Sequence, residues 1–127
     1  MTALQHVNVV VPLGLVDEVA DFYVEVFGLR RIDKPAALRA NGGSWLDVDG
    51  YAQLHLSEKD GQVHPDSHFA LVVDDFETVL GRLTARGAEW TEQVDVFGGQ
   101  RGFTRDPSGN RVEVLERAGR LASPDAS

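Results

Sequence analysis

The sequence predicts an α+β protein built from two tandem βαβββ modules, whose curved mixed sheets would together form a cup. The first observation is an internal repeat: apolar runs open at His6 and His68, and helix-like segments end at Gly28 and Gly87. Equivalent positions lie about 60 residues apart, which indicates two supersecondary units that complete one core. The second observation is that one helix cannot cover both faces of a four-stranded sheet. Two such sheets, in one chain or in a dimer, therefore leave an inner face free to line a site.

The first half contains one strand, one helix and three further strands, expected at 4–11, 16–27, 29–33, 44–48 and 52–56. The first strand is continuous and rich in β-branched residues, and Pro12 stops it. The helix carries apolar residues at spacings of three and four, which gives it one apolar face. Gly28 is placed to end it in the left-handed conformation. Asn41-Gly42 and Asp49-Gly50 are typical of turns between antiparallel strands.

The second half repeats this order after a polar connection at 57–67. Strands are expected at 68–73, 89–91, 100–105 and 111–115, with a helix between the first two that Gly87 ends. Asp74 and Glu77 have the spacing of a capping box at the start of that helix. The segments 94–99 and 106–110 are expected to be a loop and a tight turn. Residues 1–117 are therefore interpreted as one domain, with modules at about 1–57 and about 66–117, followed by a flexible tail at 118–127.

Composition narrows the range of functions. The chain has 127 residues, no cysteine and a formal net charge of −8. This charge repels phosphate backbones and anionic membranes, so neither a nucleic-acid partner nor membrane binding is expected. Because no apolar stretch is long enough to span a bilayer and the N-terminus lacks a basic leader, the expected location is the cytoplasm. Without thiolates, any bound metal must take nitrogen and oxygen ligands.

Four residues with metal-binding side chains occupy equivalent places in the two halves: His6 and His55 in the first, His68 and Glu113 in the second. Strand alternation puts each of them on a face of mixed polar and small residues, opposite the aliphatic face. Three imidazoles and a carboxylate suit Zn²⁺, Fe²⁺, Mn²⁺, Ni²⁺ or Co²⁺. A single histidine at the start of a strand is more often structural or exposed, and it is the symmetry of the four positions that favours a metal site.

Other side chains are candidates for contact with a substrate. Phe97, Arg101 and Phe103 flank a glycine-containing loop close to the last strands, and we interpret them as a wall of the substrate site. Trp45 and Trp90 are expected to serve in packing rather than as platforms for a substrate. The sequence contains no glycine-rich phosphate loop and no serine-centred nucleophile motif.

Several motifs between residues 4 and 116 point to a known family. They are His6 at the start of the first strand, Phe22-Tyr23 followed by Phe27-Gly28-Leu29, the segment 68–75 and, most specific, Asp106-Pro-Ser-Gly-Asn-Arg-Val-Glu113. With these motifs the sequence resembles the vicinal oxygen chelate superfamily. That superfamily includes glyoxalase I, methylmalonyl-CoA epimerase, fosfomycin-resistance thiol transferases, extradiol dioxygenases and bleomycin resistance proteins.

The resemblance implies a set of site residues. His6, His68 and Glu113 stand where metal-binding members have their shared ligands, so one divalent metal ion per site is expected. His55 stands where glyoxalase I has a fourth ligand, usually Glu or Gln. Histidine departs from that pattern, so His55 is either the fourth ligand or a group that acts next to the metal. Glu113 or His55 would then move the proton beside the substrate carbonyl.

The resemblance also implies a function and an assembly state. The leading hypothesis is a metal-dependent, glyoxalase-like lyase or isomerase that acts on a small molecule chelated through vicinal oxygens. One alternative is a metal-free drug- or metabolite-binding protein like the bleomycin resistance proteins. Another is an extradiol-type ring-cleaving dioxygenase that holds Fe²⁺. Short two-module members pair to complete their cups, so a homodimer is expected.

Overall fold

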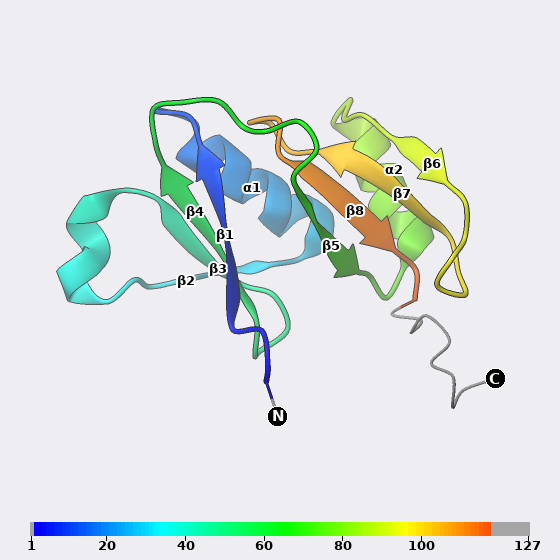
Figure 1. Ribbon diagram of the computed structural model, residues 1–127, viewed down its shortest axis with the longest axis horizontal. Helices are drawn as coiled ribbons and strands as arrows, with labels where there is room; N and C mark the ends of the chain where they lie inside the picture. The colour runs from blue at the N-terminus through cyan, green and yellow to red at the C-terminus, as the bar shows by residue number, and fades with distance from the viewer. Residues whose placement is uncertain (1, 118–127) are drawn as a thin grey trace. The chain divides into compact units, whose positions relative to one another are not determined.

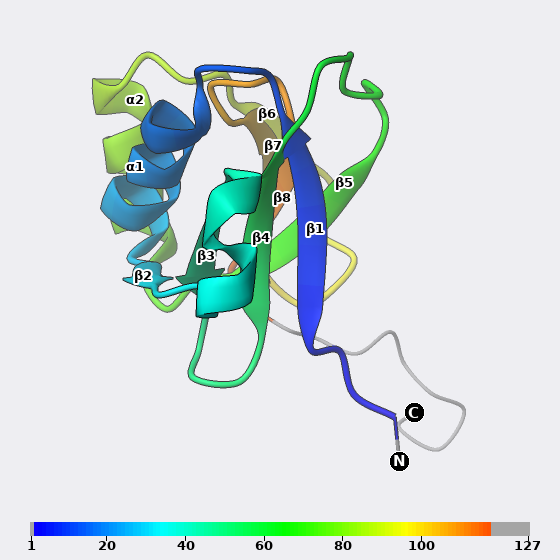
Figure 2. The same cartoon turned by 90° about the vertical axis from the view of Figure 1, so that its left-hand side faces the viewer.

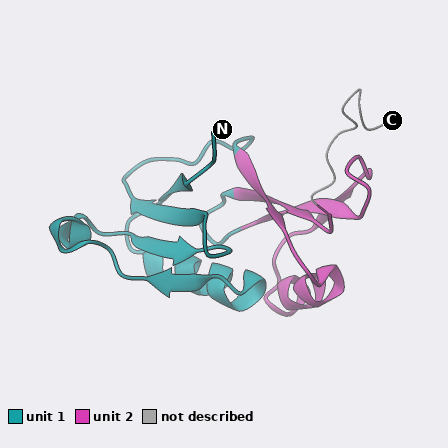
Figure 3. Cartoon of the chain, turned by 90° about the horizontal axis from the view of Figure 1, so that it is seen from below, with its two compact units in different colours: residues 1–67, 106–110 teal, residues 68–105, 111–127 magenta. Residues whose placement is uncertain are grey.

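The computed structural model describes residues 2–117, so the flexible tail predicted at 118–127 lies outside the described residues. The chain divides into two compact units (Figure 3). Unit 1 comprises Met1–Ser67 and Asp106–Asn110, and unit 2 comprises His68–Arg105 and Arg111–Ser127. Within the described part of the chain, no helix is long and apolar enough to cross a membrane.

Unit 1 is a four-stranded mixed sheet with one long helix (Figures 1 and 2). Its elements are β1 (His6–Val11), α1 (Val16–Phe27), β2 (Arg30–Ile32), the 3₁₀ helix η1 (Ala36–Asn41), β3 (Ser44–Asp47) and β4 (Gln53–Glu58). The strand order is β1-β4-β3-β2, in which β1 runs parallel to β4 and the other neighbours are antiparallel. The chain thus returns to its own first strand, which closes one βαβββ module.

Unit 2 repeats this topology. Its elements are β5 (His68–Val72), α2 (Phe76–Ala85), β6 (Thr91–Gln93), β7 (Arg101–Arg105) and β8 (Arg111–Leu115). The strand order is β5-β8-β7-β6, with β5 parallel to β8. The predicted fold class, α+β with two βαβββ modules, is confirmed.

Helix α1 covers one face of the unit 1 sheet by packing against β2, β3 and β4. Its apolar face is buried, as are the sheet residues Leu46, Leu54 and Leu56. The helix ends at Gly28, whose φ of 74° is left-handed and whose backbone N–H donates to the carbonyl of Val24 at 3.0 Å. The other face of the sheet therefore carries the alternate residues of each strand, and these include the predicted site residues.

The turn at Asp106–Asn110 joins two strands of unit 2 but belongs to unit 1. The hydroxyl of Tyr23, a fully buried α1 residue, donates to Oδ2 of Asp106 at 2.7 Å. The amide Nδ2 of Asn110 donates to the backbone carbonyl of Val10 at 3.0 Å. This turn, which begins the most specific motif in the sequence, is therefore a buried anchor for α1 and β1.

The structure corrects several expected boundaries. Helix α2 is capped by Asp75, whose side chain accepts the backbone N–H of Thr78 at 3.0 Å, and not by an Asp74–Glu77 capping box. The helix begins one residue later than that box requires, so Asp75 occupies the capping position. The 3₁₀ helix η1 was not predicted because it buries no side chain and so shows no periodicity. Strand β6 starts at Thr91 rather than at residue 89.

Candidate functional site

The open face of the unit 1 sheet carries a stack of three aromatic rings. In register, Trp45 on β3 faces His55 on β4, and β1 lies on the other side of β4. The His55 ring lies between two others: its centroid is 4.1 Å from that of Trp45, at an interplanar angle of 2°, and 4.1 Å from that of His6, at 16°. The stack holds His55 in one orientation and joins the edge strand β1 to the central strands β4 and β3 through their side chains.

His55 is buried although its ring is polar. Its exposed fraction is 8%, and its Nε2 lies 2.8 Å from Oε1 of Gln53, two residues earlier on the same face. With the amide oxygen as acceptor, Nε2 carries the proton and Nδ1 carries the lone pair. The pKa of His55 is lowered, first by burial and then by the positive charges of His6 and Lys34. The imidazole is therefore neutral at neutral pH.

This lowered pKa predicts a loss of stability in acid. The unfolded chain, with an ordinary histidine pKa of about 6.5, binds the proton more readily than the folded protein. The contribution of His55 is therefore complete above that pH and is lost as the pH falls through it toward the lower pKa of the folded state. Urea unfolding in EDTA between pH 8 and pH 5 should show a shallower pH dependence for His55→Gln than for the parent protein. The exposed His64, replaced by Gln, is the control; equal slopes for His55→Gln and the parent would contradict the prediction.

In unit 2 the second pair of predicted ligands is already in contact. Nε2 of His68 lies 3.3 Å from Oε1 of Glu113, and NH1 of Arg101 lies 2.8 Å from Oε2. Glu113 is only 7% exposed. Nε of Arg101 also donates to the backbone carbonyl of Val94 at 2.7 Å, which positions the guanidinium. Each carboxylate oxygen thus has its own partner, as a buried charged group requires.

The predicted substrate wall gathers around this pair. The ring of Phe103 meets the ring of His68 edge-to-face, with centroids 5.1 Å apart. The guanidinium of Arg111 lies 3.6 Å above the centroid of Phe103, and that of Arg101 lies 6.0 Å from the centroid of Phe97. Of the residues predicted for the site, unit 2 therefore brings together His68, Glu113, Arg101 and Phe103, and it places Phe97 beside Arg101.

The two pairs occupy equivalent places in the two units. His6 and His68 are the first residues of β1 and β5, and His55 and Glu113 are the third residues of β4 and β8. In both units the first strand runs parallel to the fourth, so the topology reproduces the same pair twice. The symmetry inferred from the sequence is therefore present in the fold of each unit.

The four residues can be tested as metal ligands from their chemistry and geometry. Among residues 2–117, no group of three or more His, Cys, Asp or Glu side chains is positioned to hold a metal ion. Imidazole and carboxylate donors suit divalent transition metals. An ion must lie in the plane of each imidazole that binds it, so the nearly parallel rings of His6 and His55 cannot both bind one ion while stacked. As donors, all four side chains suit a divalent ion, but His6 and His55 could serve one ion together only if the stack opens.

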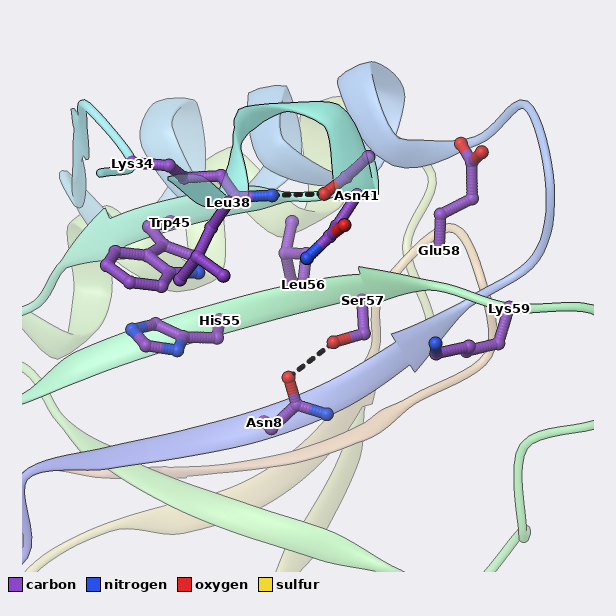
Figure 4. A pocket seen from close by; sticks show the side chains of 11 residues that line it. Asn8, Lys34, Leu38, Asn41, Trp45, His55, Leu56, Ser57, Glu58 and Lys59 are labelled. Atoms are coloured by element: carbon purple, nitrogen blue, oxygen red, sulfur yellow. Dashed lines mark hydrogen bonds between the residues drawn. The ribbon is translucent and has the colours of Figure 1, made fainter. Parts of the chain in front are cut away.

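A cavity beside the ring stack contains residues that the sequence did not single out. Lys34, Leu38 and Trp45 line it together with Asn8 and Ser57 (Figure 4). Trp45, expected to serve in packing, lies half-buried on the open face, where its ring packs against that of His55. The alternation of Trp45 with the buried Leu46 is the sequence signal that places Trp45 on the open face. No local pattern identifies Lys34 as a residue of the cavity. Trp90 does pack, with its ring centroid 5.7 Å from that of Phe76.

Comparison with known proteins agrees with this fold. The family model of the Glyoxalase/Bleomycin resistance protein/Dioxygenase superfamily matches residues 3–114. A protein from Bacillus anthracis assigned to the glyoxalase family is similar in structure, with a TM-score of 0.82 and 27% identity over 91% of this chain and 94% of that one. Among curated proteins, no sequence matches the chain significantly.

Two further structures show the same fold at lower identity. Lactoylglutathione lyase from Agrobacterium tumefaciens has a TM-score of 0.68 and 22% identity, over 91% of this chain and 93% of that one. A mutant of the fosfomycin resistance protein FosX from Listeria monocytogenes, complexed with Mn(II) and 1S,2S-dihydroxypropylphosphonic acid, has a TM-score of 0.77 and 19% identity, over 95% of each chain. With its repeated βαβββ units and its match over residues 3–114, the chain belongs to the Glyoxalase/Bleomycin resistance protein/Dioxygenase superfamily.

Proposed function

We propose that the protein is a metal-dependent enzyme of the glyoxalase-like lyase or isomerase kind, in which His6, His68 and Glu113 bind one divalent ion. The observation that carries the proposal is the repeated pair of metal-binding side chains at equivalent strand positions of the two units. In each pair one member is buried, His55 at 8% and Glu113 at 7% exposure, on a face that strand alternation separates from the aliphatic core. Burial of an ionisable side chain costs free energy, so buried ionisable side chains are typical of catalytic and binding sites. The Mn(II) in the FosX complex gives further support.

Each residue has a role that follows from its contacts. A bound divalent ion would polarise substrate oxygens and make the neighbouring C–H bond more acidic. His55 is the residue we propose to accept the proton, because its stacked ring is held in place and Gln53 occupies Nε2, which leaves the Nδ1 lone pair. Arg101 holds one oxygen of Glu113 and so fixes the orientation of that carboxylate. Phe103, which contacts His68, would form part of the wall against the substrate.

The first test is metal binding. The purified protein, stripped with chelator and titrated with Zn²⁺, Mn²⁺, Ni²⁺, Co²⁺ or Fe²⁺, should bind about one equivalent of at least one of them per site. Glu113→Gln should weaken that binding by more than about tenfold, because a ligand contributes at least as much as its supporting groups. The exposed Glu92, replaced by Gln, is the matched control. Calorimetry and elemental analysis measure both, and the absence of stoichiometric binding of any of these ions would refute the proposal.

The second test separates the base from the ligands. Incubation in D₂O with α-ketoaldehyde–thiol adducts and acyl-CoA thioesters should give metal-dependent entry of deuterium at the carbon beside the carbonyl. His55→Gln should abolish this exchange while metal stoichiometry is retained, because it removes a group used in the transition state. Uptake of oxygen with Fe²⁺ and a catechol would instead identify a ring-cleaving dioxygenase. Loss of metal from His55→Gln would make His55 a ligand.

One observation favours a metal-free binding protein as the second candidate. The guanidinium of Arg101 lies 2.8 Å from Glu113, so a fixed positive charge already neutralises this carboxylate. Such a pair would need no ion to be stable in a buried position. A protein of this kind would bind no metal and catalyse no exchange, yet its bound ligand would raise the midpoint of thermal unfolding.

A further inference from the structure

The cavity of unit 1 combines features that together select a ligand. Its volume is about 250 Å³, and it lies between the open face of the sheet and η1 (Figure 4). The residues that define its character are Asn8, Lys34, Leu38, Trp45, Ser57 and Lys59. Cavities that hold drug-sized molecules measure roughly 300–1,000 Å³. A molecule seated here is therefore small.

The charge of this cavity is opposite to that of the protein. The chain has a net charge of −8 and two lysines, and both lysines line the cavity. Among residues 2–117, no carboxylate forms an ion pair with either lysine. Nζ of Lys34 donates to the carbonyl of Gly42. The acidic lining residue Glu58 accepts instead from the backbone N–H of Gly14 at 3.4 Å. Two ammonium groups and one carboxylate thus line the cavity, so its net charge is positive.

The rest of the lining has an apolar side and a polar side. Trp45 and Leu38 form the apolar side, and Trp45 is held in place by its stack on His55. On the polar side the hydroxyl of Ser57 donates to Oδ1 of Asn8 at 2.6 Å. Because this bond uses the amide oxygen of Asn8, its amide N–H groups can donate to a ligand. In Figure 4 the side chain of Lys59 extends toward this Asn8–Ser57 pair. A donor amide and an ammonium therefore lie on one side of the cavity, and an indole on the other.

We propose that this cavity binds a small carboxylic acid with a planar or branched apolar body. The carboxylate would accept from Lys59 and from the amide of Asn8, and the body would lie against Trp45 and Leu38. Charge-assisted hydrogen bonds of this kind distinguish an acid from its neutral amide. The further step, that this acid represents the substrate class of the enzyme, rests on the proposed function. Binding of the acid itself requires no metal and no turnover.

The presence of only two lysines makes a direct binding test available. Reductive methylation with ¹³C-formaldehyde preserves the charge and labels Lys34, Lys59 and the amino terminus. Titration of the labelled protein in EDTA with benzoate should shift the two lysine signals and leave the terminal one in place. Benzamide, which has the same shape without the charge, should bind more weakly by about tenfold or more. Equal affinity for the acid and the amide, or no change in the lysine signals, would overturn the proposal.

Variants locate the site and separate it from the proposed chemistry. Lys59 is exposed, so Lys59→Gln should fold normally and weaken benzoate binding by about tenfold. Arg30→Gln removes a positive charge of equal size outside the cavity lining, where the side chain is 75% exposed, and should leave the affinity unchanged. Equal losses in both variants would show attraction by overall charge alone and would refute the site. Benzoate binding without metal binding or deuterium exchange would refute the proposed function and leave the acid site standing.

Discussion

Replacement of Asp106 by alanine is expected to lower the free energy of unfolding by about 3–5 kcal/mol, as the loss of one partner from a buried network does. Asp106 is 4% exposed and accepts four hydrogen bonds. Its Oδ1 accepts from Ser108 N–H at 2.9 Å, Ser108 Oγ at 2.6 Å and Asn110 N–H at 3.0 Å, and its Oδ2 accepts from Tyr23. The variant would leave these donors without their acceptor and would loosen the turn that anchors α1. Urea unfolding at pH 7 measures the effect.

Tyr23→Phe is the matched control for this prediction. It removes only the hydroxyl, so it should lower the free energy of unfolding by about 1–3 kcal/mol, less than Asp106→Ala. Burial first, and then the Asp106 carboxylate, raises the pKa of Tyr23 well above its ordinary value, so the phenol remains a donor across the whole range of stability measurements. A loss below about 1 kcal/mol for Asp106→Ala would show that the turn is not an anchor.

Gly43→Ala is expected to lower the free energy of unfolding by roughly 3–4 kcal/mol, through backbone strain and a steric clash. The φ of Gly43 is +83°, and a Cβ there would lie 2.2 Å from the carbonyl oxygen of Leu56. That oxygen belongs to the β4 residue opposite Ser44, the first residue of β3. The added methyl group would therefore push apart the two strands that carry Trp45 and His55. Thermal and urea unfolding measure the loss.

Gly50→Ala separates the two contributions. Gly50 has a similar φ of +91°, but a Cβ there would meet nothing within 4 Å. In this variant only the strain of a left-handed alanine should lower the free energy of unfolding, by about 1–2 kcal/mol. Equal losses at the two glycines would mean that the approach of Leu56 to Gly43 has no energetic effect, which would contradict the prediction for Gly43.

Much of the fold could be predicted from the sequence because its signals are local. Apolar residues at spacings of three and four marked α1, and a glycine after the last turn marked its end, where φ is 74°. The internal repeat predicted two βαβββ modules, and both are present. Strand alternation placed His6 and His55 on the sheet face opposite the aliphatic residues. Successive side chains of a strand point to opposite faces, and this does not depend on which strand it pairs with. The family followed from motifs that span most of the chain.

Local signals also misplaced some details. Asp74 and Asp75 are adjacent and both can cap a helix, so the capping residue depends on where the first turn starts. Helix η1 has no buried side chain, and therefore no pattern in the sequence. Its position over the open face nevertheless brings Leu38 to the cavity wall.

By itself, the sequence determined the elements, their repeat and the faces on which the metal-binding side chains lie. Only the tertiary structure decided which of these side chains touch. The stack of His6 on His55 requires β1 to pair with β4, and the hydrogen bond from Tyr23 to Asp106 joins residues 83 positions apart. Arg101 meets Glu113 through the pairing of β7 with β8. Strand register and the docking of a turn arise when distant segments pack, and no local pattern encodes that packing.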